Sequence, residues 1–98
     1  MTEVWEELEG GYAVSSFGRV KSPKGERLSL YIVGGHPATK ILDGGKKKQK
    51  LISQLVAEAF VPLPYQDCCR VRHLDGDKTN NRADNLEWIV PKKRRQGR

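Results

Sequence analysis

The sequence predicts an α+β protein made of short antiparallel strands and one helix. Three observations support this. Glycine-containing turns at residues 16–18 and 43–45 separate short strand-like stretches. Residues 52–60 have the one clear helical periodicity, and two further short strands enclose a polar loop near the C-terminal end. We therefore expect an antiparallel sheet module over residues 1–50, followed over residues 51–98 by the helix and a second small module, all in one compact unit.

The charge of the chain is unevenly distributed along its 98 residues. The net charge is +6, but the first 11 residues hold four acids and no base, so the remainder carries +10. Two basic clusters stand out: Lys46, Lys47, Lys48 and Lys50, and then Lys92, Lys93, Arg94, Arg95 and Arg98. A polyanion, most simply double-stranded DNA, is the partner that such clusters favour. A solvated basic surface with a frayed tail is the alternative.

The chain has no sign of a membrane or export segment. No apolar run approaches the roughly 20 residues that span a bilayer, and the N-terminus is acidic, unlike a signal peptide. Cys68 and Cys69 are adjacent, so a bond between them would be strained and no spaced pair suits zinc. We expect a cytoplasmic protein with two free thiols.

The N-terminal half contains several strand signals. Tyr12–Ser15 and Arg19–Lys21 are expected to pair across a turn at residues 16–18. Trp5, Tyr12, Val14 and Val20 would form the apolar face, with both aromatic rings packed in the core. A third short strand is expected over Arg27–Val33, ended by a break at Gly34–Pro37.

A hairpin and a helix follow. Ala38–Leu42 and Lys47–Leu51 are predicted to pair across Asp43–Gly45, with the lysines on the exposed edge, where they also discourage aggregation. Ile52–Phe60 is the helix, because Ile52, Leu55, Val56, Ala59 and Phe60 share one face. Ser53 is the expected N-cap, and the prolines after Val61 end the helix, which would be the scaffold for the flanking strands.

The polar loop is the candidate functional element. It lies between strands expected over Cys69–Leu74 and Leu86–Val90, with His73 at the end of the first. A histidine held there is a reasonable general base, although an exposed strand-end residue without a role is the alternative. Asn85 is expected to cross the loop and bond the backbone that orients His73, and the Trp88 indole is expected to pack beneath the loop. Pro91 is suited to open a short final helix.

The segment VRHLDGDKTNNRADNLEWIV, residues 71–90, resembles the core of the HNH endonucleases, the small ββα-metal nucleases common in bacteriophages. LVAEAF at residues 55–60 is similar to the helix that precedes that core. GYAVSSFGRVKS at residues 11–22, with GGKKK at 44–48, is similar to the small sheet module of phage HNH homing endonucleases. The resemblance covers essentially the whole chain, in order.

The resemblance implies roles for individual residues. His73 matches the general base and Asn85 the structural asparagine, while Lys78, Asn80 and Asn81 match loop positions. Two positions depart from the family pattern: Arg72 stands where the metal-binding carboxylate usually precedes the histidine, and Arg94 falls near the second metal ligand. Ser53 and Gln54 also replace a His-Arg pair at the start of the helix.

These departures bear on the cofactor. A hard cation such as Mg²⁺ needs oxygen ligands, whereas arginine offers none and repels the ion. We therefore expect no cofactor. Mg²⁺ or another divalent cation is expected only if the protein is catalytically active, with Asp75 and Asp77 as ligands, although capping the turn is their expected use. Arg72 and Arg94 would instead bind phosphate directly, as would Lys78 and the two basic clusters.

The preferred hypothesis is a phage-type HNH-fold protein that binds double-stranded DNA and has lost, or largely lost, metal-dependent cleavage. One alternative is an active endonuclease or nickase that uses His73 as base with an altered metal site. Another is a phage protein that binds and inhibits a host protein. In each case the expected location is the cytoplasm of an infected bacterium, and recognition of two DNA strands would be easier for a homodimer.

Overall fold

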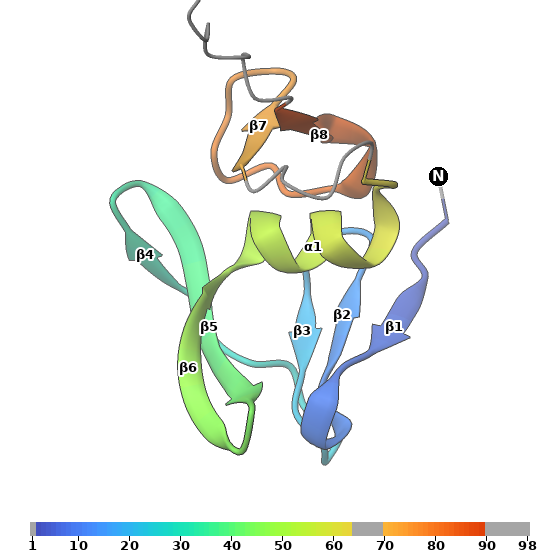
Figure 1. The fold of residues 1–98 in the computed structure, drawn as a ribbon, viewed down its shortest axis with the longest axis vertical. Coiled ribbons are helices and arrows are strands. Elements are labelled where there is room, and N and C mark those ends of the chain that lie inside the picture. The colour runs from blue at the N-terminus through green and yellow to red at the C-terminus, as the bar shows by residue number, and fades with distance from the viewer. Residues whose placement is uncertain (1, 64–69, 90–98) are drawn as a thin grey trace, which may run out of the picture.

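The computed structural model describes residues 2–63 and 70–89, and it contains three small antiparallel sheets arranged around one helix. In Figure 1, the helix α1 (Ile52–Phe60) crosses the middle of the molecule, with the two N-terminal sheets on one side and the C-terminal strand pair on the other. The expected α+β architecture is confirmed. The helix is the element that both halves of the chain share.

The first sheet has the order β1-β2-β3. Its strands are β1 (Trp5–Glu7), β2 (Ala13–Ser15) and β3 (Val20–Lys21), with a 3₁₀ turn, η1 (Glu9–Gly11), between the first two. Val14 and Val20 pair directly and are fully buried, and Tyr12 is buried beside them. Trp5 is only half-buried, with the Lys21 ammonium 4.1 Å from its ring centroid, so the prediction that it packs in the core was wrong.

The second sheet has the order β4-β5-β6 and differs from the prediction at its start. Its strands are β4 (Tyr31–Val33), β5 (His36–Asp43) and β6 (Lys46–Leu51). The strand expected over Arg27–Val33 is short, since Arg27 forms only an isolated bridge with Lys21. The break is also shorter than expected, because His36 and Pro37 already belong to β5. Pro37 faces β4 alone, and pairing with β6 begins at Ala38, so its missing N–H removes no bond to β6.

The β5–β6 hairpin forms as predicted. Gly44 and Gly45 have φ values of +66° and +83°, as a two-residue turn of this kind requires. The Glu9 carboxylate accepts hydrogen bonds from both of their backbone N–H groups, at 2.9 and 3.2 Å. Lys46, Lys47 and Lys48 are exposed on the edge strand β6, as expected.

Helix α1 has the predicted bounds, but its N-cap residue differs from the predicted one. Ile52, Leu55 and Val56 are buried, and Ala59 and Phe60 are partly buried against the same core. The N-cap is Leu51, whose side chain makes no capping bond, and Ser53 is buried within the first turn. The helix therefore begins without a polar cap, directly from the extended end of β6, and packing fixes its start. No helix in the described part of the chain has the length and apolar character needed to cross a bilayer.

The third sheet pairs β7 (Arg70–His73) with β8 (Leu86–Ile89), preceded by the 3₁₀ turn η2 (Ala83–Asn85). Trp88 is buried, and its indole N–H donates to the carbonyl of Val61, just beyond α1, at 2.9 Å. The ring thus ties β8 to the helix end, and the expectation that it lies beneath the loop was wrong. The predictions for Cys68, Cys69 and the helix at Pro91 concern residues outside the described ranges.

Candidate active site

Asn85 fixes the loop that joins β7 to β8. Its side chain is buried; Oδ1 accepts from the Asp75 N–H at 3.1 Å, and Nδ2 donates to Asp75 Oδ1 and to the Asn80 carbonyl, both at 2.9 Å. Its own carbonyl accepts from the Leu74 N–H at 2.8 Å. Asn85 therefore crosses the loop and bonds its backbone next to His73, as the sequence predicted.

The two aspartates cap the turn. Asp75 accepts from the Asn80 amide through Oδ2 and from the Asp77 N–H through Oδ1, both at 2.8 Å. These bonds, with that from Asn85, lower the pKa of Asp75 to about 2. Asp77 Oδ1 accepts from the hydroxyl and the N–H of Thr79 at 2.7 and 3.0 Å, and these bonds lower the pKa of Asp77. Both carboxylates are ionised and turned toward their own loop.

Asn81 orients His73. The histidine is half-buried, and its Nε2 lies 2.6 Å from Oδ1 of Asn81, which is itself buried. An oxygen acceptor at this distance holds the ring hydrogen on Nε2 and leaves Nδ1 as the basic nitrogen. Asn81 was predicted only as a loop position, because nothing in the spacing distinguishes it from Asn80. A histidine with a fixed tautomer is the geometry that a general base needs.

The turn at residues 16–18 of the N-terminal half packs against the loop segment that holds Asn81. The Ala83 N–H donates to the Ser16 carbonyl at 2.7 Å, and the Arg82 guanidinium lies 4.1 Å from the Phe17 ring centroid. Gly18 has φ +91°, and a Cβ there would come within 3.1 Å of the Asn81 carbonyl oxygen. The tight turn at residues 16–18 therefore packs directly against the loop.

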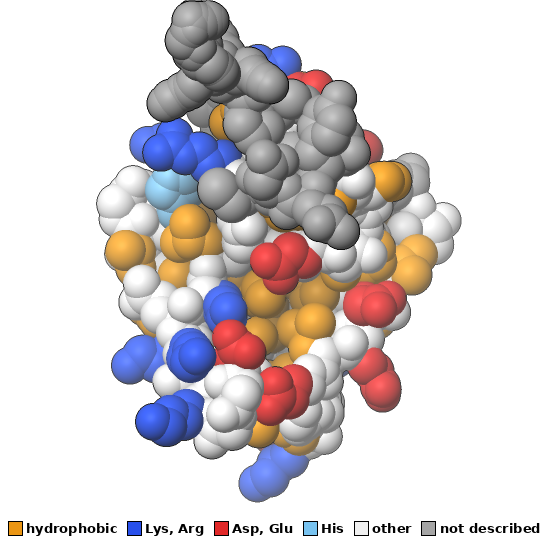
Figure 2. All heavy atoms as spheres, in the orientation of Figure 1, with side chains coloured by type: hydrophobic (Ala, Val, Ile, Leu, Met, Phe, Trp, Pro, Cys, Tyr) orange, Lys and Arg blue, Asp and Glu red, His pale blue; other side chains and the backbone are white. Residues whose placement is uncertain are grey.

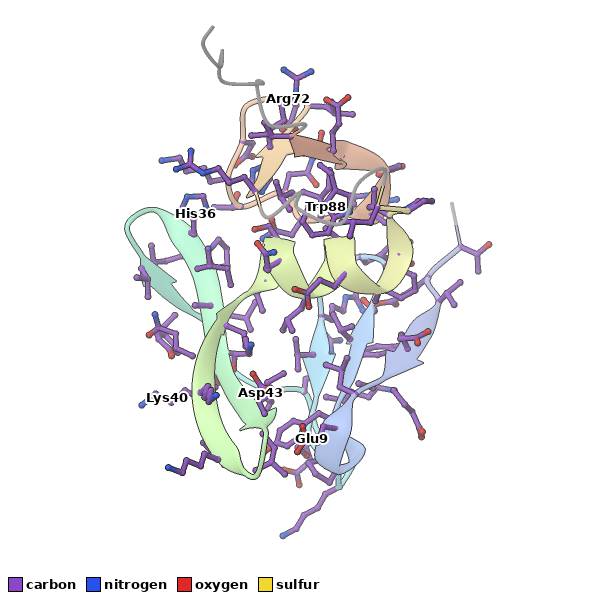
Figure 3. All side chains as sticks on the ribbon, in the orientation of Figure 1. Glu9, His36, Lys40, Asp43, Arg72 and Trp88 are labelled. Carbon is purple, nitrogen blue, oxygen red and sulfur yellow. The ribbon has the colours of Figure 1, made fainter. Side chains whose placement is uncertain are left out.

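A second histidine, His36, lies beside His73. The two ring centroids are 6.1 Å apart, and the rings are tilted by 40°. His36 comes from the start of β5, and Figure 3 shows it between the tip of the β4–β5 hairpin and the β7–β8 loop. Nothing in the sequence pointed to His36, because 37 positions separate it from His73 and only the fold brings the two together.

Arg72 does not share the face of His73. Neighbouring residues on a strand point to opposite sides, and along β7 the arginines are exposed whereas Val71 and His73 are half-buried. Arg72 Nε lies 2.7 Å from Glu87 Oε1 in an exposed cross-strand ion pair. Figure 3 shows the side chain pointing away from the body of the molecule. The structure therefore does not bring Arg72 and His73 together.

The remaining basic residues are spread along the molecule. Lys46, Lys47 and Lys48 are at the hairpin end of β6, which Figure 1 places at the opposite end from β7 and β8. Lys78 is in the His73 loop and is exposed. Figure 2 shows Lys and Arg side chains beside the histidine at the upper left and again at the lower left, with hydrophobic and uncharged atoms between them, and acidic side chains mainly toward the centre and right. Lys92, Lys93, Arg94 and Arg95 lie outside the described residues.

The described residues do not fit a divalent cation. Nowhere in residues 2–63 and 70–89 do three or more His, Cys, Asp or Glu side chains form a group that could hold a metal ion. Both oxygens of Asp75 accept hydrogen bonds within the loop. Asp77 has one oxygen taken up by Thr79, and Arg72 offers no oxygen.

The chain is similar in sequence to known HNH endonucleases. Residues 50–96 match the HNH endonuclease family. Over 93 residues the chain is 37% identical to the DNA endonuclease I-HmuI of Bacillus phage SP01. This alignment covers 90% of this chain and 53% of that protein. It is 36% identical over 82 residues to the H-N-H endonuclease F-TflI of Escherichia phage T5, covering 81% of this chain and 42% of that protein.

The fold is also similar to that of a solved HNH homing endonuclease. A structure described as DNA binding and cleavage by the HNH homing endonuclease I-HmuI superposes with a TM-score of 0.76 and 33% identity, covering 89% of this chain and 52% of that one. The chain thus matches the HNH endonuclease family over residues 50–96 and has the fold of the phage homing endonuclease I-HmuI. It spans about half the length, or less, of these relatives.

Proposed function

We propose that this chain binds double-stranded DNA through an HNH-type site at which metal-dependent cleavage is lost or impaired. The observation that supports this most strongly is the set of side chains around His73. The histidine and its asparagine support are present, but both oxygens of Asp75 accept hydrogen bonds inside the loop, and Arg72 stands where the resemblance places the family's carboxylate. The residues that shape the loop are present, whereas no group of three or more His, Cys, Asp or Glu side chains that could hold a cation occurs in residues 2–63 and 70–89.

DNA is the partner favoured by the relatives and by the charge. The I-HmuI structure is described as binding and cleaving DNA. In this chain, exposed lysines lie on the edge strand β6 and in the His73 loop. A duplex is long enough to run past both, because it presents phosphates along its whole length. Contacts of this kind give affinity without dependence on the base sequence.

Loss of the cation explains why cleavage would be impaired while binding persists. His73 Nδ1 can accept a proton from an attacking water. Attack at phosphorus also builds negative charge on the phosphate oxygens, which a bound divalent cation would stabilise. Arg72 is exposed, paired with Glu87 and on the opposite strand face, so it is poorly placed to supply positive charge to a phosphate held by His73.

The second candidate is an active endonuclease or nickase. The short His73–Asn81 bond favours it, since a fixed tautomer and a rigid loop are costly to maintain for a residue without a chemical role. In this case Asp77 would be the available carboxylate of the loop, through the oxygen that Thr79 does not engage. Cleavage would then require that oxygen to approach a cation shared with the substrate.

A gel-shift titration of duplex DNA tests the binding proposal. The expected affinity is the same in EDTA as in Mg²⁺. It should fall steeply with salt: the plot of log affinity against log salt concentration should have a negative slope of about 0.9 for each phosphate neutralised. Replacing Lys46, Lys47 and Lys48 by glutamine should make that slope shallower. Loss of binding in EDTA would contradict the proposal, because it would mean that a cation is required at the interface.

A further inference from the structure

His36, Lys78 and His73 form a basic cluster where the two halves of the chain meet. We propose that this cluster is a phosphate-binding site that grips a single phosphodiester of the DNA backbone beside His73, with His36 and Lys78 as the groups that contact its oxygens. The inference rests on the proposed DNA binding and adds a contact from the N-terminal half to the site.

The β4–β5 hairpin brings His36 to the loop. His36 is the first residue of β5 and follows the turn at Gly34 and Gly35, which have φ values of +58° and +86°. This turn puts the His36 ring 6.1 Å from that of His73, centroid to centroid. A spacing of this size leaves the two rings close enough to contact the same small group.

Lys78 reaches the cluster from the other side. Its side chain lies across the glycine turn: Cδ and Nζ are 3.5 and 3.6 Å from the position that a Cβ on Gly35 would occupy. The Lys78 side chain therefore packs along the glycine turn at van der Waals distance. The lysine ammonium is one of the charges that act on His36.

No ion pair neutralises Lys78 among the described residues. Asp77 is the carboxylate that acts on this cluster, since the charge of His73 is one of the effects that lower the pKa of Asp77. Both oxygens of Asp75 and one of Asp77 accept hydrogen bonds from their own loop. Burial, then Lys78, then His73 lower the pKa of His36, so its ring is neutral in the unliganded protein.

The tautomer of His36 follows from its surroundings. Its Nδ1 is buried without a hydrogen-bond partner among the described residues. A hydrogen on that nitrogen would be an unsatisfied buried donor, which is costly, so the hydrogen is expected on Nε2. His36 then offers one neutral N–H donor, and Lys78 offers one cation.

A phosphodiester matches this pair of groups. It carries one negative charge and two non-bridging oxygens, so the Lys78 ammonium balances its charge and the His36 N–H bonds an oxygen. His73 Nδ1 would lie beside the same phosphate as a base. An anion here also relieves the unfavourable effect of Lys78 on a protonated His36, so DNA binding should raise the pKa of His36.

Two exposed lysines provide a matched test. Lys78→Gln should weaken duplex binding about ten-fold and reduce the salt slope by about one. Lys24→Gln, at an exposed lysine that likewise makes no ion pair among the described residues, should change neither value. His36→Phe, which keeps a ring but removes the donor, should weaken binding by a similar factor. In the His36→Phe protein, Lys78→Gln should then reduce the affinity less than it does in wild type.

Ring-nitrogen NMR provides an independent readout, because the chain has only two histidines. Addition of duplex DNA should shift the His36 ring signals and raise the pKa of His36, with a smaller effect in the Lys78→Gln protein. If wild type bound DNA while Lys78→Gln behaved like Lys24→Gln and the His36 signals stayed unmoved, the cluster would be excluded and the DNA-binding function would stand. If wild type failed to bind DNA, both proposals would fall.

Discussion

Asn81 and Asn85 are two buried amides in one loop, and each fixes a different part of it. Asn85 bonds the backbone at Asp75 and Asn80, whereas Asn81 bonds the ring of His73. A buried amide left without partners is costly, so both bond sets constrain the loop strongly. The position of the candidate base thus depends on asparagines more than on the neighbouring aspartates.

Replacement of Asn81 by alanine should release the His73 ring. Without the Oδ1 acceptor, the hydrogen is no longer held on Nε2, and ring-nitrogen NMR should show a mixture of tautomers. The lost buried bond should also lower the free energy of unfolding by about 1–3 kcal/mol. Thr79→Val, which removes an exposed loop hydroxyl, is the control and should leave the His73 tautomer unchanged. An unaltered tautomer in Asn81→Ala would refute this role.

Asp75 should make the stability of the protein acid-sensitive. Its pKa in the folded protein is lowered from 3.8 to about 2, so it stabilises the fold above pH 4 and that contribution is lost as the pH falls from about 4 to about 2. Asp75→Asn should therefore be less stable than wild type at pH 7 and should show a shallower loss over that window. Denaturant titration at several pH values measures this, with Asp84→Asn as the control. Parallel wild-type and Asp75→Asn curves would contradict it.

At the residue scale, the sequence predicted what local chemistry determines. His73 at a strand end, Asn85 across the loop and the capping aspartates were all anticipated, because turn residues bond within a few positions of themselves. Asn81 and Asn80 are chemically identical neighbours, and only the course of the backbone decides which one meets the histidine. His36 gave no signal, since its neighbours are far away in sequence.

At the scale of elements, α1 is the common support of the two halves. Ile52, Val56 and Ala57 are fully buried, and the core around them includes Val14 and Val20 from the first sheet and Leu86 from β8. Periodicity predicted the helix and its bounds. It did not predict the N-cap, which is Leu51 and not Ser53, because the helix continues directly from the extended end of β6.

Trp88 provides the test of this element packing. Trp88→Phe removes the bond to the Val61 carbonyl and part of the buried ring, so the free energy of unfolding should fall by about 1–3 kcal/mol. Trp5→Phe, at the half-buried tryptophan over which the Lys21 ammonium lies, should cost less, on the order of 0.5–1 kcal/mol. Equal losses from the two substitutions would mean that β8 is not tied to the helix end through this ring.

At the scale of the whole molecule, the candidate site lies where distant segments meet. The turn at residues 16–18 supports Asn81 from behind, and the tip of the β4–β5 hairpin brings His36 to His73. Sequence patterns predicted the turn at residues 16–18 and the polar loop separately, but they treated residues 34–37 as a break and did not predict the β4–β5 hairpin. They could not predict this meeting, because it depends on tertiary packing across separations of several tens of residues. Arg72 illustrates the converse: adjacent to His73 in sequence, it lies on the opposite face.

The central claim is that the fold and the base are retained while metal-dependent cleavage is lost or impaired. Incubation of supercoiled plasmid with wild type and with His73→Ala, over a series of Mg²⁺ and Mn²⁺ concentrations, tests it most directly. Wild type is expected to show little or no nicking under conditions in which it binds the DNA. Robust nicking by wild type that His73→Ala abolishes would contradict it.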